Sequence, residues 1–256
     1  MRQYSDMSTR YGAVDEEDPP LRPPRIEAVP WSATADASPR MHQLLSGREQ
    51  EELVNIATVV DADRTTGPLF LAGTNADYVY SVDHGIVRVI RDIVNGDRQI
   101  VAFMFPGDLV GLAASGRYVN SAEPVTPCRL YRYPIKALRR LLATDPLLEL
   151  HLLVKASHEL RASQRILSII AREPVYERLA CFVALLMRQE GLFDRRSRQL
   201  VIPMTRFDIA DYLAAAPETL ARCFRQLEDM NKIQRVGARL IQIIDDDFFA
   251  GFGKVL

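Results

Sequence analysis

The chain has 256 residues, a hydrophobic content of 48% and a formal net charge of −1. This length allows two modest cores, so we expect two domains. The near-neutral charge is a poor match to a nonspecific nucleic-acid binder. The sequence contains no run of about 20 apolar residues, so we expect no membrane span.

Residues 1–40 are rich in proline and contain the acidic stretch Asp15–Asp18. They lack the apolar segment of a signal peptide. We predict that this segment is disordered. Three cysteines without a secretory signal favour a reducing cytoplasm over disulfide bonds.

Residues 41–144 are predicted to form a β-rich domain. Between Tyr78 and Phe105 apolar and polar residues alternate in several short runs. The runs are bounded by turn signals at Asp83-His84-Gly85, Asn95-Gly96-Asp97 and Pro106-Gly107-Asp108. Strands at this spacing are typical of an antiparallel barrel or sandwich.

Residues 145–171 are predicted to form one long helix. Six positions on one face follow one another at alternating spacings of 3 and 4 residues: Leu153, Ala156, Leu160, Ser163, Leu167 and Ile170. This pattern indicates a coiled coil with an identical helix, and thus a homodimer. Packing of the same face on the chain's own barrel is the alternative.

Residues 172–256 contain the most informative segment, Thr205–Asp229, which reads as two short helices joined by a tight turn. Thr205 can cap the first helix, and Pro217 suits the first turn of the second. Leu220, Phe224 and Leu227 form the apolar stripe of that second helix. This layout is typical of a helix-turn-helix, whose second helix enters the DNA major groove.

Glu218 and Arg222 stand four residues apart on another face of the second helix. An arginine there can donate two hydrogen bonds to guanine, and a glutamate can accept one from cytosine. An ordinary surface ion pair is the alternative. The following run, Met230–Asp245, reads as a β-hairpin that turns at Gly237-Ala238, so the motif is predicted to be a winged helix.

Several segments together resemble the CRP/FNR superfamily of bacterial transcription regulators, over residues 46–256. They are Gly96–Ile100, Pro106–Gly111, Glu177–Ala180, Met204–Arg206, Asp208–Leu213 and the helix with Glu218, Thr219 and Arg222. The resemblance is strongest to the FixK and FnrN branch. It implies an α+β fold: an N-terminal antiparallel β-barrel like the cyclic-nucleotide-binding jelly roll, a long dimerisation helix and a C-terminal winged helix-turn-helix.

The resemblance also implies roles for individual residues. Glu218, Ala221 and Arg222 would read the bases of a TTGAT-like half-site in double-stranded DNA. Contacts to DNA phosphates are expected from Thr205, Arg206, Thr219, Arg235 and Arg239. The turn has Ala214-Ala215-Ala216 where the family usually has Gly-Leu-Thr. The second helix is therefore expected to enter at a different angle, and the DNA sequence preference of the motif is expected to shift.

The barrel lacks the residues of known sensors in the superfamily. No glutamate or Arg-Ser pair follows Gly107-Asp108, so cyclic AMP is not expected. Three cysteines cannot supply the four ligands of an FNR iron–sulfur cluster, although Cys128 resembles its internal ligand. His42, His84, His151 and His158 show no pairing pattern, and the last two are expected to be exposed. We therefore expect no cofactor and no metal.

Cys181 lies among apolar residues and is expected to be a buried, inert thiol. Cys223 lies beside Arg222, with Arg225 close by, which would favour its thiolate and allow oxidation to switch DNA binding off. The other reading of Cys223, and the one we expect, is a thiol turned towards the core.

No phosphate-binding loop, metal-ligand spacing or nucleophile motif occurs, so an enzyme is not expected. The sequence predicts a cytoplasmic, homodimeric DNA-binding regulator with no membrane contact. By resemblance it would be an activator that works with RNA polymerase on genes of microaerobic or anaerobic metabolism. The alternative is a small-molecule or redox-sensing module of the same architecture with degenerate DNA binding.

Overall fold

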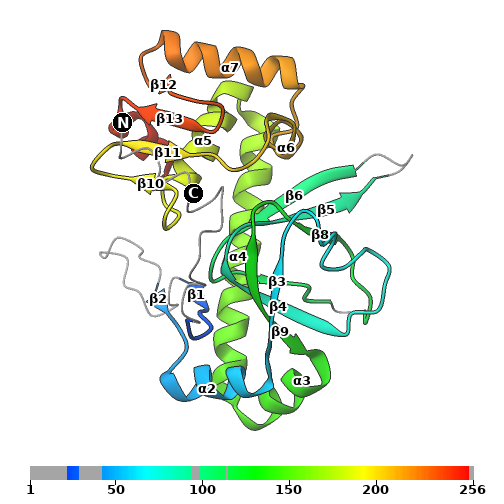
Figure 1. The fold of residues 1–256 in the computed structure, drawn as a ribbon. Coiled ribbons are helices and arrows are strands. Elements are labelled where there is room, and N and C mark those ends of the chain that lie inside the picture. The colour runs from blue at the N-terminus through cyan, green and yellow to red at the C-terminus, as the bar shows by residue number, and fades with distance from the viewer. Residues whose placement is uncertain (1–21, 29–41, 94–97, 114, 254–256) are drawn as a thin grey trace. The chain divides into compact units, whose positions relative to one another are not determined.

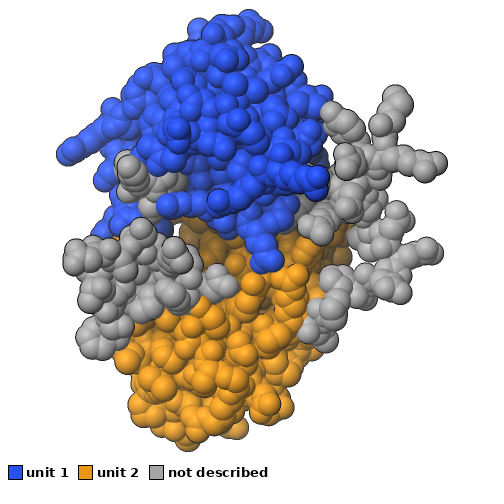
Figure 2. Space-filling view, turned by 90° about the vertical axis from the view of Figure 1, so that its left-hand side faces the viewer, with its two compact units in different colours: residues 1–15, 162–256 blue, residues 16–161 orange. Residues whose placement is uncertain are grey.

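The computed structural model describes residues 22–28, 42–93, 98–113 and 115–253 (Figure 1). These residues divide into two compact units. The first in chain order lies within Glu16–Arg161 and is orange in Figure 2, and the second lies within Ala162–Leu256 and is blue there. The division falls inside the long helix, whereas the sequence suggested boundaries at its ends.

The first unit is an antiparallel barrel of two sheets, and it confirms the predicted fold class. One sheet has the order β3 (Thr58–Ala62), β9 (Cys128–Pro134), β4 (Tyr78–His84), β7 (Leu109–Val110). The other has the order β6 (Arg98–Met104), β5 (Val87–Asp92), β8 (Ser121–Pro124). The turn signal at residues 95–97 lies outside the described residues, but Asp92 and Arg98 on either side pair as a hairpin requires.

Two turns of the barrel depend on particular residues. Gly85, between β4 and β5, has φ +87°, and a Cβ there would lie 2.3 Å from the carbonyl oxygen of Pro127. Any other residue would force the backbone apart. After β6, the carboxylate of Asp108 accepts a hydrogen bond from the amide of Phe105 at 2.8 Å and so closes the Pro106-Gly107-Asp108 turn.

A second layer covers the outer face of the β3-β9-β4-β7 sheet. It contains β1 (Glu27–Ala28), β2 (His42–Gln43), α2 (Gly47–Ile56) and α3 (Ile135–Thr144). Ile26 is only 2% exposed and packs in this layer's core with Leu53 and Tyr131. The expectation of disorder is therefore wrong for residues 22–28, because apolar side chains in a proline-rich segment find a sheet to cover. The two helices were not predicted.

The predicted long helix is confirmed as α4 (Pro146–Arg172). Its first half is amphipathic: Leu148 and Lys155 are buried, whereas Leu153 and Leu160 are 65% and 60% exposed. Leu167, seven residues further on, is 66% exposed. The three leucines of the face with heptad spacing are thus uncovered within the described chain.

The second unit is a winged helix-turn-helix, as predicted. Its helices are α5 (Val175–Leu186), α6 (Arg206–Tyr212), α7 (Pro217–Asp229) and α8 (Asp246–Gly253). Its sheet has the order β10 (Phe193–Asp194), β11 (Gln199–Val201), β13 (Leu240–Ile243), β12 (Ile233–Arg235). The hairpin β12–β13 is the predicted wing. Helices α5 and α8 and strands β10 and β11 were not predicted.

Candidate nucleic-acid interface

Helix α6 begins at a capping box. The hydroxyl of Thr205 accepts a hydrogen bond from the amide of Asp208 at 3.0 Å, and the Asp208 carboxylate accepts one from the amide of Thr205 at 3.1 Å. Ile209 and Ala210 then point into the core. This reciprocal cap fixes where the helix-turn-helix starts.

The turn between α6 and α7 has a backbone that glycine would normally supply. Ala214 has φ +50°, in the left-handed region. The amide of Ala214 donates to the carbonyl of Asp211, and the amide of Ala215 donates to that of Ala210, which together form a Schellman motif. Helix α7 then begins at Pro217 without a side-chain cap. The usual geometry of the motif therefore persists despite the alanines, at the cost of strain at Ala214.

Helix α7 separates its apolar and polar residues onto two faces. Its buried stripe consists of Leu220, Cys223, Phe224 and Leu227. Glu218, Ala221 and Arg222, the three predicted base readers, are all exposed near the start of the helix. Arg222 donates to the hydroxyl of Thr219 at 3.1 Å. In the part of the chain that the structure describes, no ion pair joins Glu218 to Arg222, so their charged groups stay accessible.

The wing is pinned to α7 by a glutamate that the sequence analysis missed. The Glu228 carboxylate lies 2.5 Å from the guanidinium of Arg235 and accepts the backbone amide of Arg235 at 3.0 Å. Hydrogen bonds from Arg235 lower the pKa of Glu228. Arg235 is therefore held at the junction of wing and recognition helix, and Arg239 lies exposed just before β13.

Arg206, a predicted phosphate contact, is half-buried. Its guanidinium carbon lies 3.6 Å from the centre of the Phe224 ring, a cation–π stack that packs the start of α6 on α7. Burial lowers the pKa of Arg206, and the nearby charge of Arg235 lowers it further. Its side chain therefore reaches DNA less freely than those of Arg222 and Arg239.

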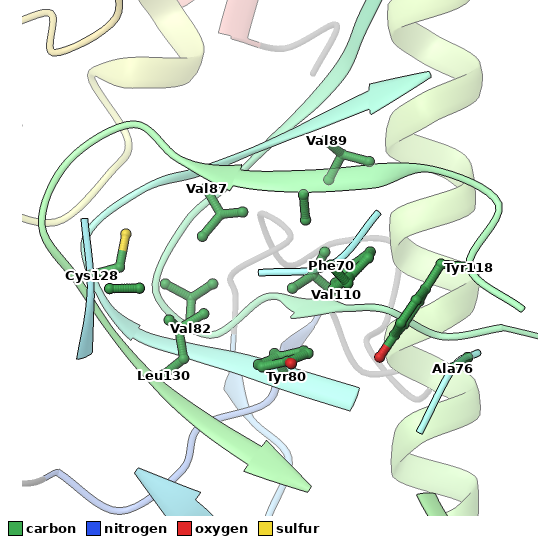
Figure 3. Close-up of a cluster of buried hydrophobic side chains, with 12 residues drawn as sticks. Phe70, Ala76, Tyr80, Val82, Val87, Val89, Val110, Tyr118, Cys128 and Leu130 are labelled. Atoms are coloured by element: carbon green, nitrogen blue, oxygen red, sulfur yellow. The ribbon is translucent and has the colours of Figure 1, made fainter. Parts of the chain in front are cut away.

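The barrel interior of the first unit is lined by aromatic side chains (Figure 3). Phe70 and Tyr118 stack with ring centres 3.8 Å apart. The Tyr118 hydroxyl donates to the carbonyl of Tyr78 at 2.7 Å, and Tyr80 lies in the same buried cluster. These rings fill the space between the two sheets around β4 and β7.

Comparison with known proteins connects both units to one family. A profile described as "Cyclic nucleotide-binding domain" matches residues 67–145, and one described as "Crp-like helix-turn-helix domain" matches residues 177–247. The nitrogen fixation regulation protein FixK of Azorhizobium caulinodans is 32% identical over 229 residues, which cover 86% of this chain and 92% of FixK.

The chain belongs to the CRP/FNR family of transcription regulators. The transcriptional activatory protein AadR of Rhodopseudomonas palustris is 35% identical over 62% of this chain and 67% of AadR. The solved structure of FixK2 from Bradyrhizobium japonicum superposes with a TM-score of 0.70 and 27% identity, covering 77% of this chain and 97% of FixK2. The predicted family, its DNA-binding helix-turn-helix and the absence of an enzymatic function are thereby confirmed.

One expectation about a titratable residue of this family member is wrong, and of the two readings of Cys223 the thiol turned towards the core is the one that holds. His151 is not an exposed side chain, because its Nδ1 lies 2.9 Å from the buried carboxylate of Glu49 on α2. Arg222 does not make Cys223 a favoured thiolate: burial raises the pKa of the Cys223 thiol, and the charge of Arg222 opposes this only in part. The sequence placed Cys223 by its neighbours in the chain, whereas the helix turns its thiol away from them into the core.

The other two cysteines are also buried. Burial raises the pKa of Cys128 and that of Cys181 to about 11 in each case. Cys181 is therefore the inert thiol that its apolar neighbours predicted. None of the helices in the described ranges has the length and apolar character needed to cross a membrane.

Proposed function

We propose that this CRP/FNR family member binds a TTGAT-like palindrome in promoter DNA as a homodimer and activates transcription there together with RNA polymerase. The resemblance to the FixK and FnrN branch suggests target genes in microaerobic or anaerobic metabolism. The activating role is supported by the similarity to AadR, whose name describes an activator. Because bacterial promoters lie in the cytoplasm, this is where the protein would work.

The observation that carries the proposal is the exposed face at the start of α7. Glu218, Ala221 and Arg222 lie there together, on the side opposite the buried stripe. The guanidinium of Arg222 offers the paired donors that suit guanine, and the carboxylate of Glu218 suits the amino group of cytosine. The methyl group of Ala221 can contact a thymine methyl.

Contacts to phosphates would surround this face. Arg239 and Arg235 on the wing would reach one strand of the backbone, and Thr205, Arg206 and Thr219 would line the start of the two helices. Thr205 and Arg206 also support the motif itself, through the capping box and the stack on Phe224. Loss of either is therefore expected to reduce stability as well as affinity.

The uncovered leucines of α4 support the homodimer. Leu153, Leu160 and Leu167 recur every seven residues, each about two-thirds exposed, and Ala156, Ser163 and Ile170 stand between them on the same seam. Burying one leucine contributes about 1.5–3 kcal/mol. A second α4 packed on this seam would cover all of them, and two recognition helices about 34 Å apart then match successive major grooves.

A titration tests the proposal. The purified, reduced protein, without added ligand, is titrated into a duplex containing TTGAT-N4-ATCAA and into a scrambled duplex. We expect tight binding to the first duplex only. The Arg239→Ala variant should weaken binding to both duplexes alike, because a phosphate contact carries no sequence information. Equal binding of the parent protein to both duplexes would contradict the proposal and favour a sensing module whose DNA binding is degenerate.

A further inference from the structure

Arg178, in the first turn of α5, makes hydrogen bonds to the residues that follow the ends of α4 and α6. Its Nε donates to the carbonyl of Glu173 at 2.8 Å. Its Nη1 donates to the carbonyls of Leu213 and Ala214 at 3.0 and 3.4 Å. One guanidinium therefore joins three backbone carbonyls. One lies 5 residues before Arg178 in the chain, and the other two lie 35 and 36 residues after it.

The three carbonyls all belong to helix C-termini. Glu173 follows the last residue of α4, and its amide still bonds to the carbonyl of Ile169. Leu213 and Ala214 follow the last residue of α6. Helix C-termini leave carbonyl groups unpaired and carry partial negative charge. A guanidinium, with its fixed fork of donors and permanent charge, suits the junction of two such ends.

The junction lies at the point that directs the recognition helix. Ala214 is strained, and the chain from Ala214 to Pro217 sets the direction in which α7 leaves α6. By holding the carbonyls of the two peptide groups that flank Ala214, Arg178 opposes relaxation of Ala214 out of the left-handed region. It also ties this turn to the end of α4.

We infer that Arg178 is a positioning residue for base recognition: it fixes the direction of α7 by joining the end of α4 to the strained turn of the helix-turn-helix. The inference rests on the proposed reading of bases by α7. Arg178 donates its hydrogen bonds to backbone carbonyls of the chain itself, so its effect on DNA is indirect. It should alter discrimination between sequences more than affinity for DNA in general.

The test compares the intact parent protein with Arg178→Gln, Arg178→Lys and the control Arg188→Gln. Arg188 lies exposed just beyond the end of α5, so its variant removes the same charge without touching the junction. For each protein, dissociation constants are measured for the TTGAT-N4-ATCAA duplex and the scrambled duplex, and urea unfolding is recorded. Discrimination is expressed as the dissociation constant for the scrambled duplex divided by that for the TTGAT-N4-ATCAA duplex. We expect Arg178→Gln to lower this ratio about tenfold, because charged hydrogen bonds are lost. Arg188→Gln should leave the ratio unchanged.

A second background separates positioning from general stability. With Ala214→Gly the turn is no longer strained, so Arg178→Gln should lower the ratio only about threefold. A ratio unchanged by Arg178→Gln in a discriminating parent, with or without lower stability, overturns the inference. If the glutamine variant does not fold, Arg178→Lys decides: it keeps the charge but not the fork, and an unchanged ratio overturns the inference. A parent that binds both duplexes equally refutes the proposed function and the inference with it.

Discussion

Replacing Ala214 by glycine is expected to stabilise the winged-helix unit. Ala214 has φ +50° and ends α6 in a Schellman motif, the position that glycine most often occupies. The left-handed conformation costs an alanine about 1–2 kcal/mol, which the glycine variant would not lose. The unfolded chain is more flexible with glycine, however, and this lowers the stability of the variant by about 0.4–1 kcal/mol. The free energy of unfolding should therefore rise by about 0.5–1 kcal/mol.

Hydrogen exchange of the intact protein measures this effect locally, which avoids treating a two-domain chain as one cooperative unit. The slowest amides of α6 and α7 should exchange about two- to fivefold more slowly in Ala214→Gly than in the parent. Ala215→Gly is the matched control. Ala215 has no left-handed backbone, so the same substitution one residue later should lower the stability of the unit by about 0.5–1 kcal/mol. Exchange that is unchanged or faster in Ala214→Gly would refute the assignment of strain to this turn.

Three further predictions concern the dimer seam, a buried carboxyl and the cysteines. Leu160→Glu should weaken dimerisation at least about a hundredfold, because each protomer of the dimer loses one buried leucine side chain at the seam. Sedimentation should then show monomers. The control Val54→Glu, at an exposed position of α2, should stay dimeric. Burial raises the pKa of Glu159 to about 7, beside Lys155 and Asp108, so this carboxyl binds a proton more tightly in the folded chain. Its contribution to stability is full below pH 4.5 and is lost as the pH rises towards 7, so Glu159→Gln should flatten the fall in urea stability between pH 5 and pH 8; an unchanged slope would count against this. Cys223 should react slowly with a maleimide at pH 8 until the protein is unfolded, and rapid labelling of the native protein would show that the thiol is accessible.

The sequence predicted those elements that are determined by local signals. Thr205 caps α6 and Pro217 starts α7, as the sequence suggested for both. Gly85 likewise marked a true turn. Each of these signals depends on residues within one turn of the backbone, which a single sequence contains in full.

The contacts that the sequence did not predict join residues far apart in the chain. The sequence assigned no role to Lys155, yet this residue is buried and its ammonium group lies 2.7 Å from the carboxylate of Asp108, 47 residues earlier. Arg206 was expected to contact DNA phosphates, and its stack on the Phe224 ring was not predicted. The bridge from Arg178 to Leu213 and the pair of Glu228 with Arg235 are of the same kind. Such contacts follow from tertiary packing, which periodicity and spacing do not encode.

The most direct test of base reading by α7 is the binding of Arg222→Ala to a set of duplexes that each change one base pair of the TTGAT half-site. Because Arg222 is exposed and outside the core, the variant should fold normally. It should lose about 1–3 kcal/mol of affinity for the parent site and lose preference at one base pair only. Equal losses on the TTGAT duplex and on random DNA, with the preference at every position intact, would contradict the assignment of Arg222 as a base-reading residue.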